Sequence, residues 1–174
     1  MNILQRGKQF FWALGAKVTA ADEAFFTHWL PERQARELFL SQTAPDQKHA
    51  LRVAYTAQQL ARGKTLDLPL LLRAALLHDT GRTAADMSTM GKVFAVILTK
   101  VFSASWLKRK ALKHRHKFLW HIIYIYYFHP QIGAEKLRQA GLLQEAELVA
   151  GHHLPAAQNE PPELTILRQA DNLN

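Results

Sequence analysis

The sequence of 174 residues contains no cysteine. This absence excludes disulfide bonds, zinc sites built on thiolate ligands and a cysteine nucleophile. Two further catalytic signatures are missing, because the chain has neither a Gly-x-Ser-x-Gly motif nor a glycine-rich loop of the kind that binds nucleotide phosphates. Any chemistry that the chain performs must therefore depend on other side chains.

Long hydrophobic runs are absent too. The most apolar internal stretch, residues 93–107, contains Lys100 and is shorter than the ~20 residues that a membrane-spanning helix needs. The apolar stretch at residues 9–16 is too short for a secretory signal peptide, which has a longer apolar core followed by a small-residue cleavage site. The composition, 48% hydrophobic and 21% charged, is typical of a folded domain. We therefore expect a soluble, cytoplasmic protein.

Acidic residues are scarce in one part of the chain. The whole sequence has 22 Lys and Arg against 14 Asp and Glu, a net charge of +8. Between Asp86 and Glu135 there is no other acidic residue, and the eight bases in that interval account for the whole excess. These bases are Lys92, Lys100, Lys108, Arg109, Lys110, Lys113, Arg115 and Lys117. Because the charge belongs to one segment and no recognition helix stands out, nucleic-acid binding is not expected.

The same segment is rich in aromatic side chains, and we expect it to form a helical insertion at about residues 87–128. Trp106, Phe118 and Trp120 flank its densest run of bases. Such a segment would suit contact with an anionic membrane surface through residues 92–128, or a lid over a phosphorylated substrate. Alternatively, its apolar side packs on the rest of the domain and its bases are merely solvated.

Apolar residues elsewhere recur at spacings of three and four with little strict alternation, which predicts an all-α fold. Thr19 and Asp22 have the spacing of a capping box. Pro45 is placed to open a helix that Gly63 stops. Pro130 is expected to start a new helix after the one before it has ended.

These signals predict that the chain divides into two parts. Residues 1–44 are expected to form an N-terminal helical extension that packs on the core, with dimerisation through its aromatic residues as the alternative. Residues 45–174 are expected to form the main domain.

Histidine and aspartate residues gather at the predicted helix ends. Five histidines and two aspartates fall there, on five separate elements: His49, His78, Asp79, His129, His152, His153 and Asp171. A lone histidine at a helix end is usually a cap or a satisfied buried residue, so the interpretation depends on the ordered set. Imidazole and carboxylate suit divalent transition metals. Seven candidates exceed what one ion normally takes from protein, which points to more than one ion.

In this order the residues resemble the HD-domain (HDIG-like) metal-dependent phosphohydrolases. The resemblance runs from about residue 46 to 171 and rests on Asp46-Gln-Lys-His49, Leu77-His78-Asp79-Thr80-Gly81, His129-Pro130-Gln-Ile-Gly133-Ala134, His152-His153 and Ala170-Asp171. It implies a helical bundle around a metal site. The other histidines, His28, His114, His116 and His121, are excluded as ligands, the second and third because they lie within the basic run.

Carried over by position, the resemblance implies a first metal held by His49, His78, Asp79 and Asp171. Asp79 would bridge to a second metal held by His129 and by His152, His153 or both. The expected cofactors are two divalent transition metal ions, iron or manganese first, with zinc, nickel or cobalt as alternatives.

Three departures narrow the resemblance. Pro45 stands where members with a third metal carry a glutamate, so a third ion is not expected. Leu154 to Ala157 stand where the HD-GYP branch has Gly-Tyr-Pro, which argues against cleavage of cyclic dinucleotides. Arg82 stands where that branch often has lysine, and an arginine can still bind phosphate bidentately.

The predicted activity is hydrolysis of a phosphate ester, with a nucleotide-like substrate. Asp79 and Arg82 are the predicted catalytic residues, and Lys48, Arg52 and Arg82 the predicted phosphate-binding residues, although Arg82 also reads as an ordinary surface residue. Two alternatives stay open: a di-iron oxygenase with similar ligands, and a metal-stabilised module without activity that docks on membrane or nucleic acid.

Overall fold

The computed structural model describes residues 17–174, and every regular element within that range is helical, which confirms the all-α prediction. The apolar stretch at residues 9–16 lies outside the described residues. The helices are α2 (Ala20–Trp29), α3 (Arg33–Leu40), α4 (Ala44–Leu60), α5 (Leu68–Leu77), α6 (Thr89–Val101), α7 (Ala104–His114), α8 (Phe118–Gln139), α9 (Leu143–Gly151) and α10 (Pro162–Leu173).

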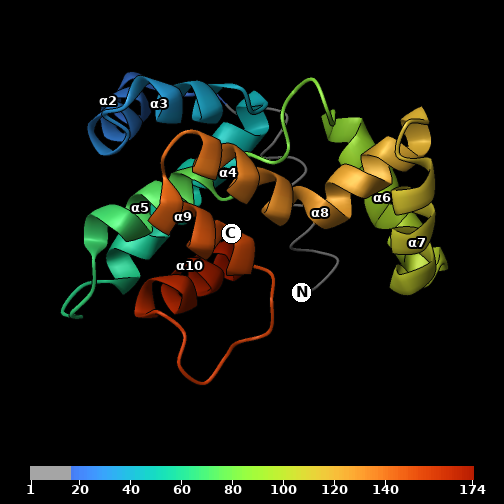
Figure 1. Cartoon of the computed structure of the whole chain (residues 1–174). Coiled ribbons are helices and arrows are strands. Elements are labelled where there is room, and N and C mark those ends of the chain that lie inside the picture. The colour runs from blue at the N-terminus through green and yellow to red at the C-terminus, as the bar shows by residue number, and fades with distance from the viewer. Residues whose placement is uncertain (1–16) are drawn as a thin grey trace.

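Helices α4, α5, α8, α9 and α10 form a bundle, which α2 and α3 cover on one side (Figure 1). Helix α5 lies at its centre, and its residues Leu71, Leu72, Leu76 and Leu77 are fully buried. Burial of a leucine side chain contributes about 2 kcal/mol, so these four contribute strongly to the stability of the bundle. The core therefore surrounds the segment that leads into His78 and Asp79.

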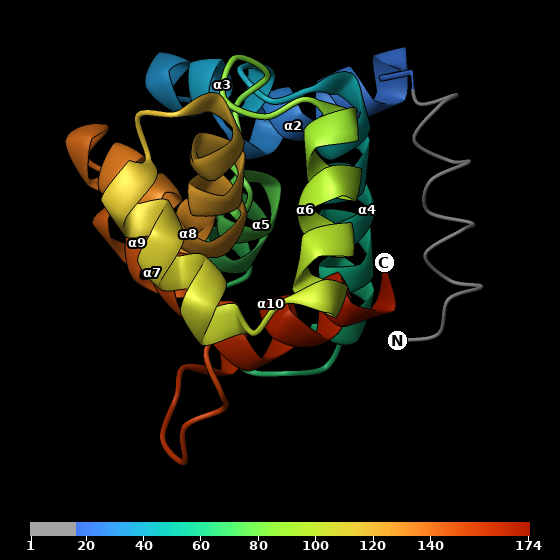
Figure 2. The ribbon, with the colours of Figure 1, turned by 90° about the vertical axis from the view of Figure 1, so that its right-hand side faces the viewer.

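A second, smaller apolar cluster lies at the other end of the molecule. There α6 and α7 pack against the first half of α8 (Figures 1 and 2). Met87, Leu107 and Ile123 are its fully buried large side chains. The buried Asp46 on α4 accepts a hydrogen bond from Lys92 on α6, which ties this end to the bundle.

Several predicted helix boundaries are confirmed. Thr19 and Asp22 form a reciprocal capping box, with Thr19 N donating to Asp22 Oδ2 at 2.8 Å and Asp22 N donating to Thr19 Oγ1 at 3.2 Å. Gly63 follows α4 with a φ of +71°, a left-handed conformation that glycine adopts without strain. Pro45 lies in the first turn of α4, as predicted.

The predicted break at Pro130 is wrong, because α8 continues through it to Gln139. Proline has no N–H to donate to the carbonyl four residues earlier, which here belongs to Tyr126. His129 supplies the missing donor, since its Nδ1 lies 3.0 Å from the Tyr126 oxygen. The helix thus stays intact, and the predicted end of the basic segment at residue 128 falls inside α8.

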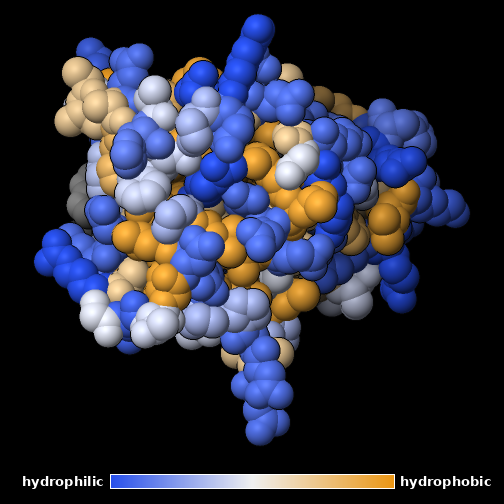
Figure 3. Space-filling view, turned by 60° about the vertical axis from the view of Figure 1, so that its left-hand side comes forward, coloured by the Kyte–Doolittle hydropathy of each residue, from blue (hydrophilic) through white to orange (hydrophobic). Residues whose placement is uncertain are grey.

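One face of the molecule shows apolar areas between hydrophilic side chains (Figure 3). Within residues 17–174, no helix is both long enough and apolar enough to cross a membrane.

A buried carboxylate attaches the N-terminal helices to the bundle. Asp22 on α2 accepts hydrogen bonds from Lys48 Nζ at 2.7 Å and from the Tyr55 hydroxyl at 3.2 Å, both on α4. Burial disfavours ionisation of Asp22, but the hydrogen bonds from Lys48 and Thr19 outweigh it and lower the pKa of this carboxyl to about 2. The described part of the predicted extension therefore docks on the core through an ion pair as well as through Phe26.

Replacing Asp22 with Asn should lower the free energy of unfolding at neutral pH by about 2 kcal/mol, since one pKa unit corresponds to ~1.4 kcal/mol. A carboxyl with a depressed pKa stabilises the fold above its ordinary pKa of 3.8, and this contribution disappears as the pH falls toward about 2. The free energies of unfolding of wild type and Asp22→Asn, measured in urea, should therefore become equal as the pH falls through that range. The control Glu23→Gln, on an exposed residue of the same helix, should behave as wild type. A difference that does not depend on pH would contradict the assignment.

Candidate metal centre

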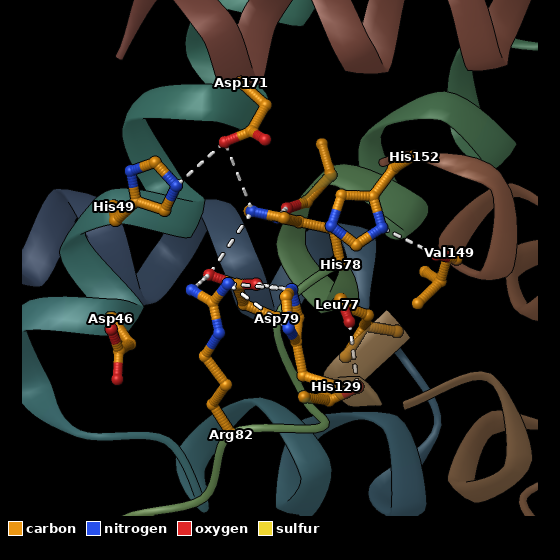
Figure 4. Close-up of polar contacts among 12 residues, drawn as sticks. Asp46, His49, Leu77, His78, Asp79, Arg82, His129, Val149, His152 and Asp171 are labelled. Atoms are coloured by element: carbon orange, nitrogen blue, oxygen red, sulfur yellow. Dashed lines mark hydrogen bonds and ion pairs between the residues drawn. The ribbon is translucent and has the colours of Figure 1, made fainter. Parts of the chain in front are cut away.

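The structure brings all seven predicted metal ligands into one cluster, and Figure 4 shows six of them, all but His153. His49 lies on α4, His78 and Asp79 follow α5, and His129 lies within α8. The His152–His153 pair follows α9, and Asp171 lies in the last turn of α10. Five segments that are far apart in sequence therefore each contribute one or two donor side chains.

Two groups of donors lie within this cluster. His49, His78 and Asp79 form one group and His129, His152 and His153 form the other, each with its ligand atoms within 4.8 Å of one another. Asp171 joins the first group, because its Oδ1 lies 3.1 Å from His49 Nε2 and 3.7 Å from His78 Nε2. The same separation into two sets is what the resemblance implied.

The carboxylate of Asp79 lies between the two groups. Its Oδ2 is 3.6 Å from His78 Nε2, and its Oδ1 is 3.3 Å from His129 Nε2. One oxygen thus faces each group, which is the arrangement that a bridging carboxylate requires.

Backbone carbonyls orient three of the histidines. His78 Nδ1 lies 2.8 Å from the Ala75 oxygen and His152 Nδ1 lies 2.6 Å from the Val149 oxygen. His129 Nδ1 makes the corresponding contact with the Tyr126 oxygen. A carbonyl only accepts, so Nδ1 carries the proton and the lone pair is on Nε2. All three rings therefore present Nε2 to the centre, as metal-binding histidines with an anchored second nitrogen do.

Burial keeps the rings of His129 and His152 neutral. It lowers the pKa of His152 to about 3, and the charges on His78 and His153 act in the same direction. Burial and the charge of Arg82 likewise lower the pKa of His129 well below its usual range. A neutral imidazole has the free lone pair that a metal needs, so at neutral pH neither ring must lose a proton before it coordinates.

The buried polar atoms of the cluster fit divalent transition metal ions. His78 Nε2, Asp79 Oδ1 and His152 Nε2 are buried and make no hydrogen bond within the described part of the chain. Such atoms cost free energy unless a partner satisfies them. Since they converge from two segments and combine nitrogen with carboxylate oxygen, a transition metal ion is the partner that suits them.

The guanidinium of Arg82 places a positive charge beside Asp79 and His129. Its Nη1 donates to Asp79 Oδ2 at 2.9 Å and its Nη2 donates to His129 Nε2 at 2.8 Å. Burial alone would raise the pKa of Asp79, but the positive charge of Arg82 is the largest opposing cause and the pKa lies well below its usual range. Asp79 therefore stays ionised at neutral pH although only 2% of it is exposed.

A close backbone contact sets the distance between Asp79 and His129. A Cβ at Gly81 would overlap the carbonyl oxygen of His129, and a Cβ at Gly133 would lie 3.0 Å from the Gly81 nitrogen. The turn after α5 can therefore approach α8 only because both positions are glycine. This contact brings the Asp79 carboxylate to the His129 ring.

The other predicted phosphate-binding residues lie on α4. The ammonium of Lys48 is ion-paired with Asp22 rather than directed at the cluster. Arg52 follows His49 by three residues and lies on the same face of α4, where burial lowers its pKa. A role for either in substrate binding stays a prediction.

The carbonyls of Ala75, Tyr126 and Val149 were not among the groups predicted for the site. The last four carbonyls of a helix accept no hydrogen bond within the helix. His78 and His152 are the C-cap residues of α5 and α9, so their rings were placed to donate to such carbonyls. The Tyr126 carbonyl could be recognised because Pro130, four residues later, has no N–H to donate to it.

His121, one of the histidines excluded as ligands, lies elsewhere: its Nε2 is 3.6 Å from Asp86 Oδ1.

Comparison with known proteins gives one match. The family model described as HD domain matches residues 47–174, which is most of the chain. None of the curated proteins or solved structures matches.

Replacing Gly81 with Ala should destabilise the protein by at least about 2 kcal/mol, because the new methyl group overlaps a backbone carbonyl that cannot move alone. Metal retained after dialysis should fall as well, since the turn carries Asp79. Gly91→Ala is the control, because a Cβ there meets its nearest atoms at 3.5 Å and alanine favours a helix. Equal melting temperatures for the two variants would contradict the packing argument.

Replacing Arg82 with Met should destabilise the metal-free protein by about 3 kcal/mol, because the buried Asp79 charge loses its partner. For a domain of this size the melting temperature should fall by roughly 6–12 °C in EDTA. Added Mn²⁺ or Co²⁺ should restore most of the loss, since a metal ion would neutralise the same carboxylate. Arg33→Met, which removes an exposed ion pair with Glu37, should change little in either condition. If Arg82→Met melts as wild type does in EDTA, the guanidinium does not compensate Asp79.

Proposed function

The chain belongs to the HD domain family, and on that basis we propose that it is a metal-dependent phosphohydrolase that cleaves a phosphate ester at a two-ion centre. The observation that carries the proposal is the position of Asp79, whose two oxygens face separate groups of histidines. A carboxylate that faced one group only would support a single ion.

The donor atoms divide into a set for each ion. His49, His78 and Asp171 would hold the first ion with Asp79, and His129, His152 and His153 would hold the second with it. His153 is more exposed than His152, so we expect His152 to be the stronger ligand of the pair. When bound, two such ions activate a water molecule and neutralise the charge that develops on a phosphoryl group.

The protein side chains have three tasks in this scheme. Asp79 would hold the two sets at a fixed separation and supply negative charge in a buried position. The anchored Nδ1 atoms of His78, His129 and His152 keep their rings from rotating, so the Nε2 atoms are oriented before any ligand binds.

Arg82 would be the phosphate clamp. Its guanidinium already lies against Asp79 and His129, and its planar pair of donors matches two oxygens of a phosphate. Arg52 would assist from the His49 face of α4. Nucleotide-like phosphomonoesters and phosphodiesters are the substrate class that we propose.

The test combines metal analysis with a panel of nucleotide and simple phosphate esters. Asp79→Ala should lose both ions and at least about 99% of the hydrolysis, because several kcal/mol of charge stabilisation depend on the metal. His129→Gln should lose one ion of the two. His28→Gln, on an exposed histidine of α2, should keep both metal and activity.

Each outcome has a distinct meaning. Full metal-dependent hydrolysis by Asp79→Ala would rule out this centre. Oxygen consumption by the iron-loaded protein without phosphate release would favour an oxygenase instead. Circular dichroism of each variant separates loss of a ligand from loss of the fold.

A further inference from the structure

The proposed function makes no use of the surface at the α6–α7 end of the molecule. Eight of the twelve exposed large hydrophobic side chains in the described part of the chain lie between residues 90 and 119. Scattered exposed apolar residues are normal in proteins, but a concentration at one end indicates a surface that something covers.

The exposed apolar residues of α6 form a single stripe. Met90, Phe94, Ile97 and Val101 are 67%, 39%, 54% and 69% exposed. Their spacing of four, three and four residues places them on one face of the helix. Ala95 on another face is fully buried in the second apolar cluster.

Helix α6 is therefore apolar on two faces although only one of them is buried. Its only charged residues are Lys92, which is paired with Asp46, and Lys100. A helix that is apolar all round is normally buried on all sides, so this stripe is suited to insertion into an apolar environment.

Exposed bases lie on α7, the helix that follows α6 in the chain. Arg109 and Lys113 on α7 are exposed, and the sequence has no acidic residue between Asp86 and Glu135. Lys108 on α7 is a further cation, and its Nζ lies 5.2 Å from the centre of the Tyr127 ring on α8. Helices α6 and α7, which carry the stripe and these bases, lie at the same end of the molecule and both face the viewer in Figure 2.

These features select one class of partner. A second copy of this surface would bring like charges together, which is unfavourable. A nucleic acid would bind the bases but leave the apolar stripe in water. An anionic lipid bilayer offers phosphates to the bases and an apolar layer just beneath them, which matches both features.

We propose that α6 and α7 form a docking surface for an anionic lipid bilayer. The stripe of α6 enters the headgroup region and the bases of α7 contact lipid phosphates. The helix lies along the interface and does not cross the bilayer. This surface shares no residue with the metal centre, so the two proposals can be tested separately.

The test is sedimentation of the full chain with vesicles of phosphatidylcholine, with and without phosphatidylglycerol. Binding to the anionic vesicles should be at least about tenfold tighter and should weaken as salt is added, because a few bases act together at the surface. Equal binding to both vesicles, or no binding to either, would overturn the proposal.

Matched pairs of variants locate the contact. Ile97→Gln with Val101→Gln should weaken binding about tenfold or more. Its control is Leu143→Gln with Leu173→Gln, two leucines 61% and 65% exposed on other helices. In the same way Arg109→Gln with Lys113→Gln should weaken binding. The corresponding control is Arg62→Gln with Lys64→Gln, which removes two exposed charges near the end of α4.

Two further results would contradict the assignment. If the control pairs lose as much binding as the test pairs, the contact is elsewhere or is a general charge effect. If the stripe variant instead abolishes self-association or oligonucleotide binding, and no variant affects vesicles, a different partner covers this face. Metal content and hydrolysis by the stripe variant should equal those of wild type throughout.

Discussion

The central constraint on this molecule is the buried negative charge of Asp79. A carboxylate that is 2% exposed is tolerated only when cations or hydrogen-bond donors surround it. Arg82 in the same turn supplies such a partner, and His78 from that turn, His129 from α8 and His49 from α4 surround the carboxylate. The bundle can thus be understood as a scaffold that brings these groups to one carboxylate without exposing it to water.

Backbone carbonyls without intrahelical partners orient the ligands. At the ends of α5 and α9 such carbonyls arise because the helix stops, and in α8 because Pro130 lacks an N–H. Each is satisfied by the Nδ1 of the histidine three residues later. One local feature therefore satisfies a backbone group and directs a donor atom, and it explains why His78 and His152 lie at helix ends and His129 lies just before a proline.

Helix α8 connects the two ends of the molecule. Its first half contributes Ile122 and Ile123 to the small apolar cluster under α6 and α7, and its second half carries His129 and packs on α9. An interruption at Pro130 would have separated these halves. Because the helix is continuous, the proposed membrane surface and the metal centre are held on one rigid element.

The sequence by itself predicted the fold class, most helix boundaries near residues such as Thr19 and Gly63, and the seven residues that the structure gathers in one cluster. It could do so because capping and helical periodicity are local, and because the order of the motif blocks is visible without coordinates. The rule that proline ends a helix failed at Pro130, because the His129 side chain donates to the Tyr126 carbonyl in place of the missing backbone N–H. Only the tertiary structure decided that Asp79 faces both histidine groups, that Lys48 pairs with Asp22, and that α6 has an exposed apolar stripe. These depend on contacts between segments distant in the chain, whose relative positions are set by packing rather than by any one segment.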